Sequence, residues 1–152
     1  MKLSAILTPS LVKTSLGSVE KEEVFEEMVQ VLIDAGRLRE GDRDEALRAL
    51  FDREAKMTTG VVKGLGLPHG KIAAAKELLI ALGVSPRGIE YQAMDGAPVH
   101  VVIMVFAEIG NPGPHIEALA EVSRLFTIPG FLNKVMAARN GAEVVDLIRR
   151  EE

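Results

Sequence analysis

Two uninterrupted apolar runs in the middle of the chain constrain its fold most strongly: ELLIALGV (77–84) and VHVVIMVF (99–106). A strand with one face in water alternates polar and apolar residues, whereas a strand covered on both faces is apolar throughout. Both runs are far shorter than the ~20 residues that cross a bilayer. The pair Asp95-Gly96 between them is a turn signal. We therefore predict two neighbouring strands, buried under helices on both sides.

The sequence before these strands has the pattern of two helices. Apolar residues recur every three to four positions from Ser18 to Gly36, where the glycine marks the expected end. A second helix is expected from Asp42, with Glu45 completing a capping box. The stretch between this helix and the strands is rich in Thr and Gly, which indicates a loop with a short strand.

Three further helices are expected after the second apolar run. They should begin near Asn111–Pro112, at Pro129 as a first-turn proline, and after Asn140, where Glu143 would complete another capping box. Helices on both sides of buried strands predict a compact α/β sandwich. The absence of a linker or repeat in the sequence indicates a single domain over 1–152.

Composition narrows the class of protein. The 152 residues suit one domain with a sizeable core, and the net charge of −4 argues against a nucleic-acid partner. The chain has no cysteine, which excludes disulfides and thiolate metal sites and fits an intracellular protein. The first residues, broken by Pro9, match a signal peptide poorly. We expect a cytoplasmic protein that does not insert into a membrane.

The glycine-rich stretch VVKGLGLPHGK (61–71) first raises the possibility of a nucleotide site. A dinucleotide fingerprint needs G-x-G-x-x-G at the start of a helix. Here the glycines are spaced G-x-G-x-x-x-G, and Pro68 stands where the helix would begin. Lys71 is followed by Ile72 rather than by Ser or Thr, so a Walker motif is also absent from the sequence. Both observations argue against a nucleotide.

The alternative is that His69 is the reactive group of this stretch. One imidazole nitrogen is a nucleophile near neutral pH when the other nitrogen is held as a hydrogen-bond donor. Pro68 restricts the backbone just before the ring. Gly70 removes a side chain that would crowd an approaching partner. This arrangement suits a bulky electrophile, such as a phosphoryl group carried by another protein. A loop histidine without a role is the competing interpretation.

Four other residues are candidates for binding an anion near His69. Arg53 offers a guanidinium group, Thr58 and Thr59 offer hydroxyls, and His115 falls in the first turn of a predicted helix, where free N–H groups favour an anion. Each also has a simple structural interpretation, as a helix end, a turn residue or a helix start.

The third histidine, His100, lies inside the second apolar run and is expected to be structural. A zinc site formed by His69, His100 and His115 is an alternative, because histidine is a common zinc ligand. The three lack the close H-x-H or H-E-x-x-H spacing of such sites. We therefore expect neither a metal nor an organic cofactor.

The stretch REAKMTTGVVKGLGLPHGK resembles the hallmark of the enzyme IIA domains of the bacterial phosphoenolpyruvate-dependent phosphotransferase system, of the fructose, mannitol and nitrogen-regulatory type. The similarity continues through DGAPVHVVIMVF and PHIEALAEVSRLF and covers nearly the whole chain. The family's Ser-Thr-Gly stands here as Thr58-Thr59-Gly60. Residues 55–57 (AKM) depart from the family's usual Lys-x-Gly. The resemblance implies a mixed β-sheet sandwiched by helices.

The resemblance also implies roles for these residues. His69 would accept the phosphoryl group, Arg53 would neutralise its charge, and His115 would support the phosphorylated ring. Thr58, Thr59 and Gly70 would lie beside the phosphate. The donor would be a phosphocarrier of the HPr type, and the family suggests Nε2 of His69 as the accepting atom.

Three functions are consistent with this resemblance. The protein could pass phosphate to an enzyme IIB, which would serve sugar transport. It could be a regulatory protein that docks on transporters or kinases according to the phosphorylation of His69. It could also be an interaction domain that has lost its chemistry, although the presence of Arg53, His69 and His115 together argues against this.

Overall fold

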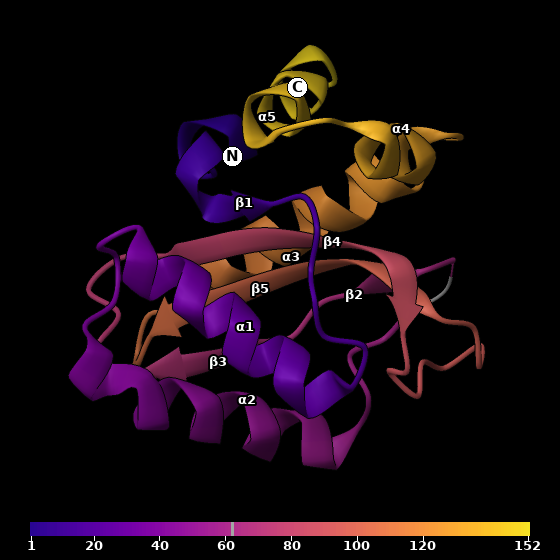
Figure 1. Ribbon diagram of the computed structural model, residues 1–152. Helices are drawn as coiled ribbons and strands as arrows, with labels where there is room; N and C mark the ends of the chain where they lie inside the picture. Colours follow the sequence, from indigo (N-terminus) through magenta and orange to yellow (C-terminus); the bar gives the residue numbers. More distant parts are fainter. Residues whose placement is uncertain (62) are drawn as a thin grey trace.

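The computed structural model describes residues 1–61 and 63–152, which form one domain around a mixed five-stranded sheet (Figure 1). Its centre is an antiparallel pair, β4 (Leu79–Ile89) and β5 (Val99–Glu108). Residues 79–85 of β4 and most of β5 are buried. The two predicted strands are confirmed, although β4 continues to Ile89.

Three short strands complete the sheet, and all of them run parallel to their neighbours. β1 (Val12–Lys13) pairs with β4, while β2 (Leu65–Gly66) and β3 (His69–Ile72) follow one another along the free edge of β5. The strand order is β1-β4-β5-β2, with β3 also on β5. The Thr- and Gly-rich stretch therefore contains two short strands, where one was expected. Val62, in the same stretch, lies outside the described residues.

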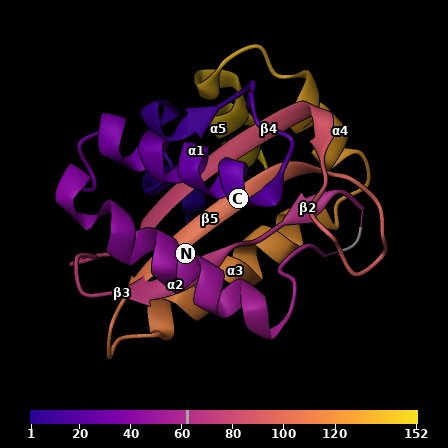
Figure 2. The same ribbon diagram turned by 60° about the horizontal axis from the view of Figure 1, so that its bottom comes forward.

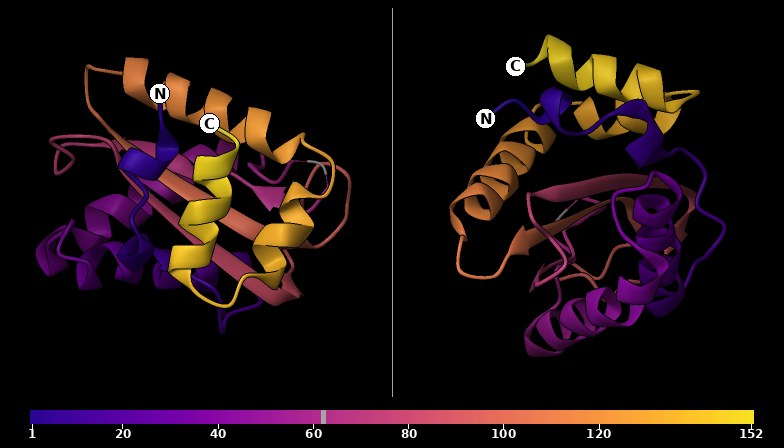
Figure 3. Two further views of the ribbon diagram at one scale, coloured as in Figure 1. Left: turned by 90° about the horizontal axis from the view of Figure 1, so that it is seen from above. Right: turned by 90° about the vertical axis from the view of Figure 1, so that its left-hand side faces the viewer.

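Helices cover both faces of this sheet, as the sequence predicted. α1 (Lys21–Asp34) contacts β4 and α2 (Arg43–Lys56) contacts β3, and the two lie side by side on one face (Figure 2). The other face carries α3 (Gly113–Phe126) against β5 and α4 (Phe131–Ala137) against β4 and β5 (Figure 3).

The last helix, α5 (Gly141–Arg150), brings the C-terminus close to the N-terminus. It packs on two 3-10 turns at the N-terminus, η1 (Leu3–Ala5) and η2 (Pro9–Leu11). The Ser4 backbone N–H and hydroxyl donate to the Glu152 carboxylate, at 2.8 and 2.6 Å. The two termini therefore lie side by side on the α3–α5 side of the sheet (Figures 1 and 3).

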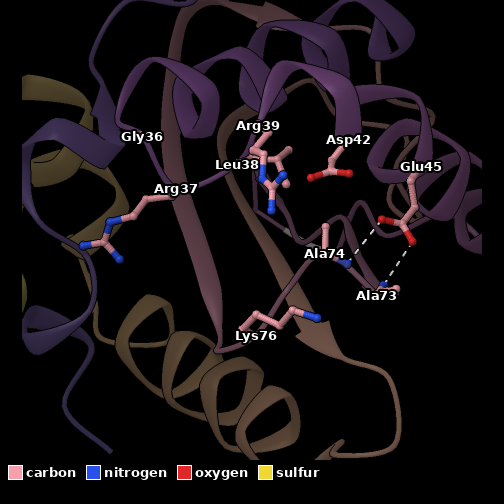
Figure 4. A pocket seen from close by; sticks show the side chains of 9 residues that line it. All are labelled: Gly36, Arg37, Leu38, Arg39, Asp42, Glu45, Ala73, Ala74 and Lys76. Atoms are coloured by element: carbon pink, nitrogen blue, oxygen red, sulfur yellow. Dashed lines mark hydrogen bonds between the residues drawn. The ribbon is translucent and has the colours of Figure 1, made fainter.

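The start of α2 differs from the predicted capping box. The helix begins at Arg43 after a 3-10 turn, η3 (Glu40–Asp42), and no side chain in the described part of the chain caps its first turn. Glu45 instead accepts hydrogen bonds from the backbone N–H groups of Ala73 and Ala74, at 3.1 and 3.3 Å (Figure 4). Its carboxylate therefore anchors the loop after β3.

The starts of the last two helices, α4 and α5, also differ in detail from the prediction. Pro129 lies before α4, whose N-cap is Gly130 in the left-handed conformation at φ 79°, so Pro129 is not a first-turn residue. Asn140 caps α5 as expected, by accepting from the Glu143 N–H at 2.9 Å. The Glu143 carboxylate accepts from the N–H of Arg139, one residue earlier than a capping box requires. Among the described residues, no helix is long and apolar enough to cross a membrane.

Candidate active site

His69 is the first residue of β3, at the edge of the sheet. Its backbone pairs with Val105 of β5, and the Val105 N–H donates to the Pro68 carbonyl at 3.0 Å. The side chain is half-buried. A central strand thus fixes the backbone on which the ring is mounted, whereas a free loop would leave the ring mobile.

The ring of His69 has a defined orientation. Its Nδ1 lies 2.8 Å from the Leu67 carbonyl oxygen, which can only accept, so Nδ1 carries the proton and Nε2 keeps its lone pair. Burial lowers the pKa of His69, and the charge of Arg53 lowers it further, against the opposing effects of Leu67 and Glu54. The ring is therefore neutral and nucleophilic near pH 7.

His115 lies against His69, although 45 residues separate them in the sequence. The ring centroids are 4.8 Å apart at an interplanar angle of 61°, and His115 occupies the first turn of α3, as predicted. Burial lowers the pKa of His115 to about 4, with smaller contributions from the positive charges of Lys71 and of His69 when that ring is protonated. In the part of the chain that the structure describes, its buried Nε2 has no hydrogen-bond partner. An unpaired buried nitrogen is costly, so this atom is suited to bind an added group.

Arg53 supplies a permanent positive charge near His69. It stands in the last turn of α2, and its Nη1 donates to the Met57 carbonyl at 2.7 Å. Its electrostatic effect on the pKa of His69 indicates that the charge acts on that ring. This bond to Met57 also holds the start of the Thr58–Gly60 segment.

The two threonines have different surroundings. The Thr58 hydroxyl accepts from the Gly60 N–H at 3.1 Å, which leaves its own hydrogen free to donate. Thr59 is only 4% exposed, and its hydroxyl lies 2.6 Å from both a Glu54 carboxylate oxygen and the Tyr91 hydroxyl. A hydroxyl enclosed in this way suits a structural role, and the phosphate-binding role of Thr59 stays a prediction.

Gly70 has a packing reason to be glycine in addition to the clearance expected for an approaching partner. A Cβ at this position would lie 3.0 Å from the Cβ of Ala49 on α2, so the missing side chain lets α2 pack closely on β3. Gly66 is similar, because its Cβ would lie 3.1 Å from the Tyr91 ring. The predicted contact between Gly70 and phosphate would be made by the backbone of Gly70.

His100 lies near the other end of β5 and away from the histidine pair. Its Nδ1 is 2.8 Å from the Ser85 carbonyl oxygen. The zinc alternative fails on this separation, since only two of the three histidines come together. Over residues 1–61 and 63–152, no cluster of three or more His, Cys, Asp or Glu side chains could hold a metal ion.

Residues that sequence reasoning missed also surround the pair. Lys71, two positions after His69, contributes positive charge. Glu54 is 8% exposed and acts on the pKa of His69; its only sequence signal is its place beside Arg53. Three large apolar side chains, in or next to the elements that form the site, are at least 60% exposed: Met57 after α2, Ile109 after β5 and Ile116 in α3.

Fold and site together define an α/β protein with a paired-histidine site at the edge of a mixed sheet. The profile of the family described as "Phosphoenolpyruvate-dependent sugar phosphotransferase system, EIIA 2" matches residues 5–151, and the chain belongs to this family. It is 35% identical over its whole length to a fructose-specific EIIABC component of Bacillus subtilis, of which it spans 24%. It is 32% identical to a fructose-specific EIIA component of Haloferax volcanii, over 96% of this chain and 94% of the relative.

Solved structures agree on the fold. The nitrogen regulatory protein IIA-Ntr of Neisseria meningitidis superposes with a TM-score of 0.86 at 24% identity, over 96% of this chain and 98% of that one. A complex of enzyme IIA-mannitol with phosphorylated enzyme IIB-mannitol from Escherichia coli matches with a TM-score of 0.76 at 17% identity, over 94% and 96% of the two chains. At these identities the likeness concerns the fold alone.

Proposed function

We propose that this protein is a phosphoryl carrier. In this role, Nε2 of His69 accepts a phosphoryl group from a phosphohistidine carrier of the HPr type. The single observation that carries the proposal is the oriented pair: His69 with Nδ1 bound to Leu67, against His115 with an unpaired Nε2. It is supported by membership of the EIIA 2 family. The acceptor in a transport role would be an enzyme IIB, the partner named in the mannitol complex.

The proposed step is an in-line exchange between two imidazoles. The Nε2 lone pair of His69 forms the new N–P bond while the N–P bond of the carrier breaks, and the carrier ring leaves with that electron pair. The proton of His69 stays on Nδ1 throughout. Positive charge that develops on the ring then faces the Leu67 carbonyl, 2.8 Å away. Because one phosphoramidate replaces another, positioning and charge neutralisation supply the catalysis.

The phosphoryl oxygens would be bound by groups already around the ring. Arg53 would leave the Met57 carbonyl, or share its fork, to meet a charge of about −2. The neutral His115 would donate from Nε2, which satisfies the unpaired atom. The free hydrogen of the Thr58 hydroxyl is a further donor. The chain has no cysteine, which fits our proposal that this exchange takes place in the cytoplasm.

The exposed apolar residues support a protein partner. Met57 lies four positions after Arg53, Ile116 directly follows His115, and Ile109 directly follows β5. Single exposed apolar residues are common, but three in segments next to the site residues suit the docking of another protein. A carrier protein that delivers a phosphohistidine would need such a surface, since its imidazole must approach His69 closely.

A regulatory role is the second candidate, and one observation favours it. A nitrogen regulatory protein of Bradyrhizobium diazoefficiens is 25% identical to this chain, over 97% of this chain and 95% of the relative. In this role the phosphate on His69 would change the charge beside Met57, Ile109 and Ile116 and so alter which target docks. Both candidates share the phosphorylated His69 and differ only in whether the phosphate is passed on or read by a target.

The test is intact-mass measurement after incubation with phosphoenolpyruvate, enzyme I and HPr. We expect one acid-labile phosphate on the wild type and on His100→Ala, which keeps the histidine pair. We expect none on His69→Ala. Equal phosphorylation of His69→Ala and wild type would refute the proposal. Transfer from the phosphorylated protein to an enzyme IIB would then favour transport, while partner binding that differs between phosphorylated and free protein would favour regulation.

A further inference from the structure

We infer that Thr59 is a positioning residue for the His69 ring, and that the Glu54 carboxylate fixes Thr59 for this task. The inference rests on the proposed function, because it concerns the same histidine. It assigns to Thr59 a role through the backbone in place of a contact with phosphate.

A continuous chain of hydrogen bonds joins Thr59 to the His69 ring. The Leu67 N–H donates to the Thr59 carbonyl at 3.0 Å, and the Leu67 carbonyl accepts from Nδ1 of His69 at 2.8 Å. The carbonyl that selects the tautomer of His69 thus belongs to a residue held by Thr59. A displacement of Thr59 would shift this acceptor and loosen the ring.

Thr59 is itself fixed by Glu54. The carboxylate accepts from the Thr59 N–H at 2.8 Å and from the Thr59 hydroxyl at 2.6 Å, so it binds the residue at two points. Its third donor is the Lys21 ammonium group at 3.1 Å, from the first residue of α1. The Glu54 and Lys21 side chains are only 8% and 12% exposed. A buried carboxylate with three donors is held rigidly, and the adjacent ammonium group balances its charge.

Tyr91 is the second hydrogen-bond partner of the Thr59 hydroxyl. The Thr59 hydroxyl has one hydrogen, which it donates to Glu54, so the Tyr91 hydroxyl must donate to Thr59 across their 2.6 Å contact. Burial and then the charge of Glu54 raise the pKa of Tyr91, which keeps this donor protonated. The Lys21 ammonium lies 4.8 Å from the centre of the Tyr91 ring. Helices α1 and α2 and the segment that follows β4 therefore meet at Thr59.

The segment has little room to adjust if one of these bonds is lost. A Cβ on Gly60 would lie 2.7 Å from the Tyr91 ring and 2.8 Å from the Ala93 Cβ. The Gly60 carbonyl accepts from the Met94 N–H at 3.0 Å. Close packing on one side and Glu54 on the other define a single position for Thr59, and with it the position of Leu67.

The experiment compares Thr59→Val, Thr59→Ser and Glu54→Gln with the wild type. Two quantities are measured: the rate of phosphorylation by phosphorylated HPr, and the His69 tautomer from imidazole ¹⁵N shifts of the unphosphorylated protein. Glu27→Gln is the matched control. Glu27 likewise accepts from backbone N–H groups, of Gly17 and Ser18, and pairs with Lys13, but the hydrogen-bond chain to His69 does not include it.

We expect Glu54→Gln and Thr59→Val to lose the pure Nδ1–H tautomer and to accept phosphate about tenfold to 100-fold more slowly, since small misplacements of a reacting group have effects of this size. Thr59→Ser restores the hydroxyl and should restore both measurements. Glu27→Gln should change neither, even if it lowers stability. If Glu54→Gln unfolds the protein, the comparison of Thr59→Val with Thr59→Ser still tests the inference.

Three results would overturn the inference. Slower phosphorylation of Thr59→Val with an unchanged His69 tautomer would make Thr59 a phosphate ligand. Wild-type behaviour of Thr59→Val and Glu54→Gln in both measurements would remove the positioning role. Equal losses in Glu27→Gln and Glu54→Gln would reduce the effect to general stability. A wild type that takes no phosphate would refute the proposed function, and the tautomer measurement would still decide the positioning role.

Discussion

A histidine stands toward each end of the central strand β5, and the two are held in the same way. His69 lies opposite Val105, and His100 belongs to the strand itself. Each ring has its Nδ1 2.8 Å from a main-chain carbonyl oxygen, of Leu67 and Ser85 respectively. Each is partly buried. A fixed, oriented imidazole is therefore present twice in this domain, and orientation alone does not distinguish the two.

Their neighbours differ. The ring of His69 faces a second histidine, His115, and lies within reach of the charge of Arg53. The ring of His100 packs near the backbone of Gly88, where an added Cβ would lie 3.2 Å from its Cε1. Charge and an unpaired nitrogen beside an oriented ring therefore make one end of β5, and not the other, suited to phosphate.

The largest expected effect, beyond the loss of His69 itself, comes from removing the positive charge at this end. Arg53→Met should slow phosphorylation by about 10²-fold to 10³-fold, the usual result of deleting one preorganised charge or donor. Arg53→Lys should recover only part of the rate, because an ammonium group lacks the planar fork. The measurement is the initial rate of phosphate uptake from phosphorylated HPr.

Arg48 is the control for this change, because it is an exposed arginine on the same helix. Arg48→Met should leave the rate at the wild-type level. A similar loss in both variants would mean that overall charge, rather than the position of Arg53, governs the reaction, and the distinction between the two ends of β5 would weaken.

The next effect concerns His115 and pH. Its pKa lies near 4 in the folded protein, below the ordinary value of 6.5, so the unfolded chain binds more protons between these values. The contribution to stability is present above pH 6.5 and is lost as the pH falls towards 4. His115→Gln should therefore lose less stability than the wild type between pH 7.5 and 5.0 in urea denaturation. A residual slope from His69 is expected, since burial also lowers its pKa.

The same variant should accept phosphate roughly tenfold more slowly, because it alters one hydrogen bond to a charged group. An unchanged pH dependence of stability in His115→Gln would contradict the buried, uncharged state of His115. An unchanged rate would remove its support of the phosphate and leave Arg53 as the main difference from the His100 end.

The smallest effect contrasts two glycines, one near each histidine. Gly70→Ala would bring a Cβ to 3.0 Å from Ala49, and Gly88→Ala would place one 3.1 Å from Pro98 at a φ of +91°. We expect each to lower the free energy of unfolding by about 1–3 kcal/mol, as overpacking does. Only Gly70→Ala should also slow phosphorylation. A slower reaction in Gly88→Ala would show that the two ends of β5 are coupled.

Much of the fold follows from local sequence patterns. The apolar runs that became β4 and β5, and the periodic stretches of the helices, are long enough to be recognised from sequence alone. β1 could not be predicted, because its two residues are a strand only through pairing with Leu82 and Gly83, some 70 positions away. The capping box predicted at Glu45 was wrong for a similar reason, because its carboxylate accepts hydrogen bonds from a loop distant in sequence.

The candidate site shows the same division. His69 stood out through its flanking proline and glycine, and His115 through its helix start, but nothing in their spacing brings them together; only the resemblance implied it. Thr59 was predicted to lie beside phosphate from its hydroxyl and from the family resemblance, whereas its partners Glu54 and Tyr91 meet it only in the folded chain. Hydroxyls are versatile donors, so a sequence motif locates them without saying which bond they make.

The hydrogen bonds between Ser4 and Glu152 bear on how such a domain is tethered. The two ends leave the domain from nearly one point, on the layer opposite α2. A partner joined through a flexible linker would be held at the same effective concentration around His69 whether it precedes or follows the domain. In a fused chain, the linker length needed to reach His69 would therefore not depend on the order of the domains. A circularly permuted version of the domain would keep the same geometry.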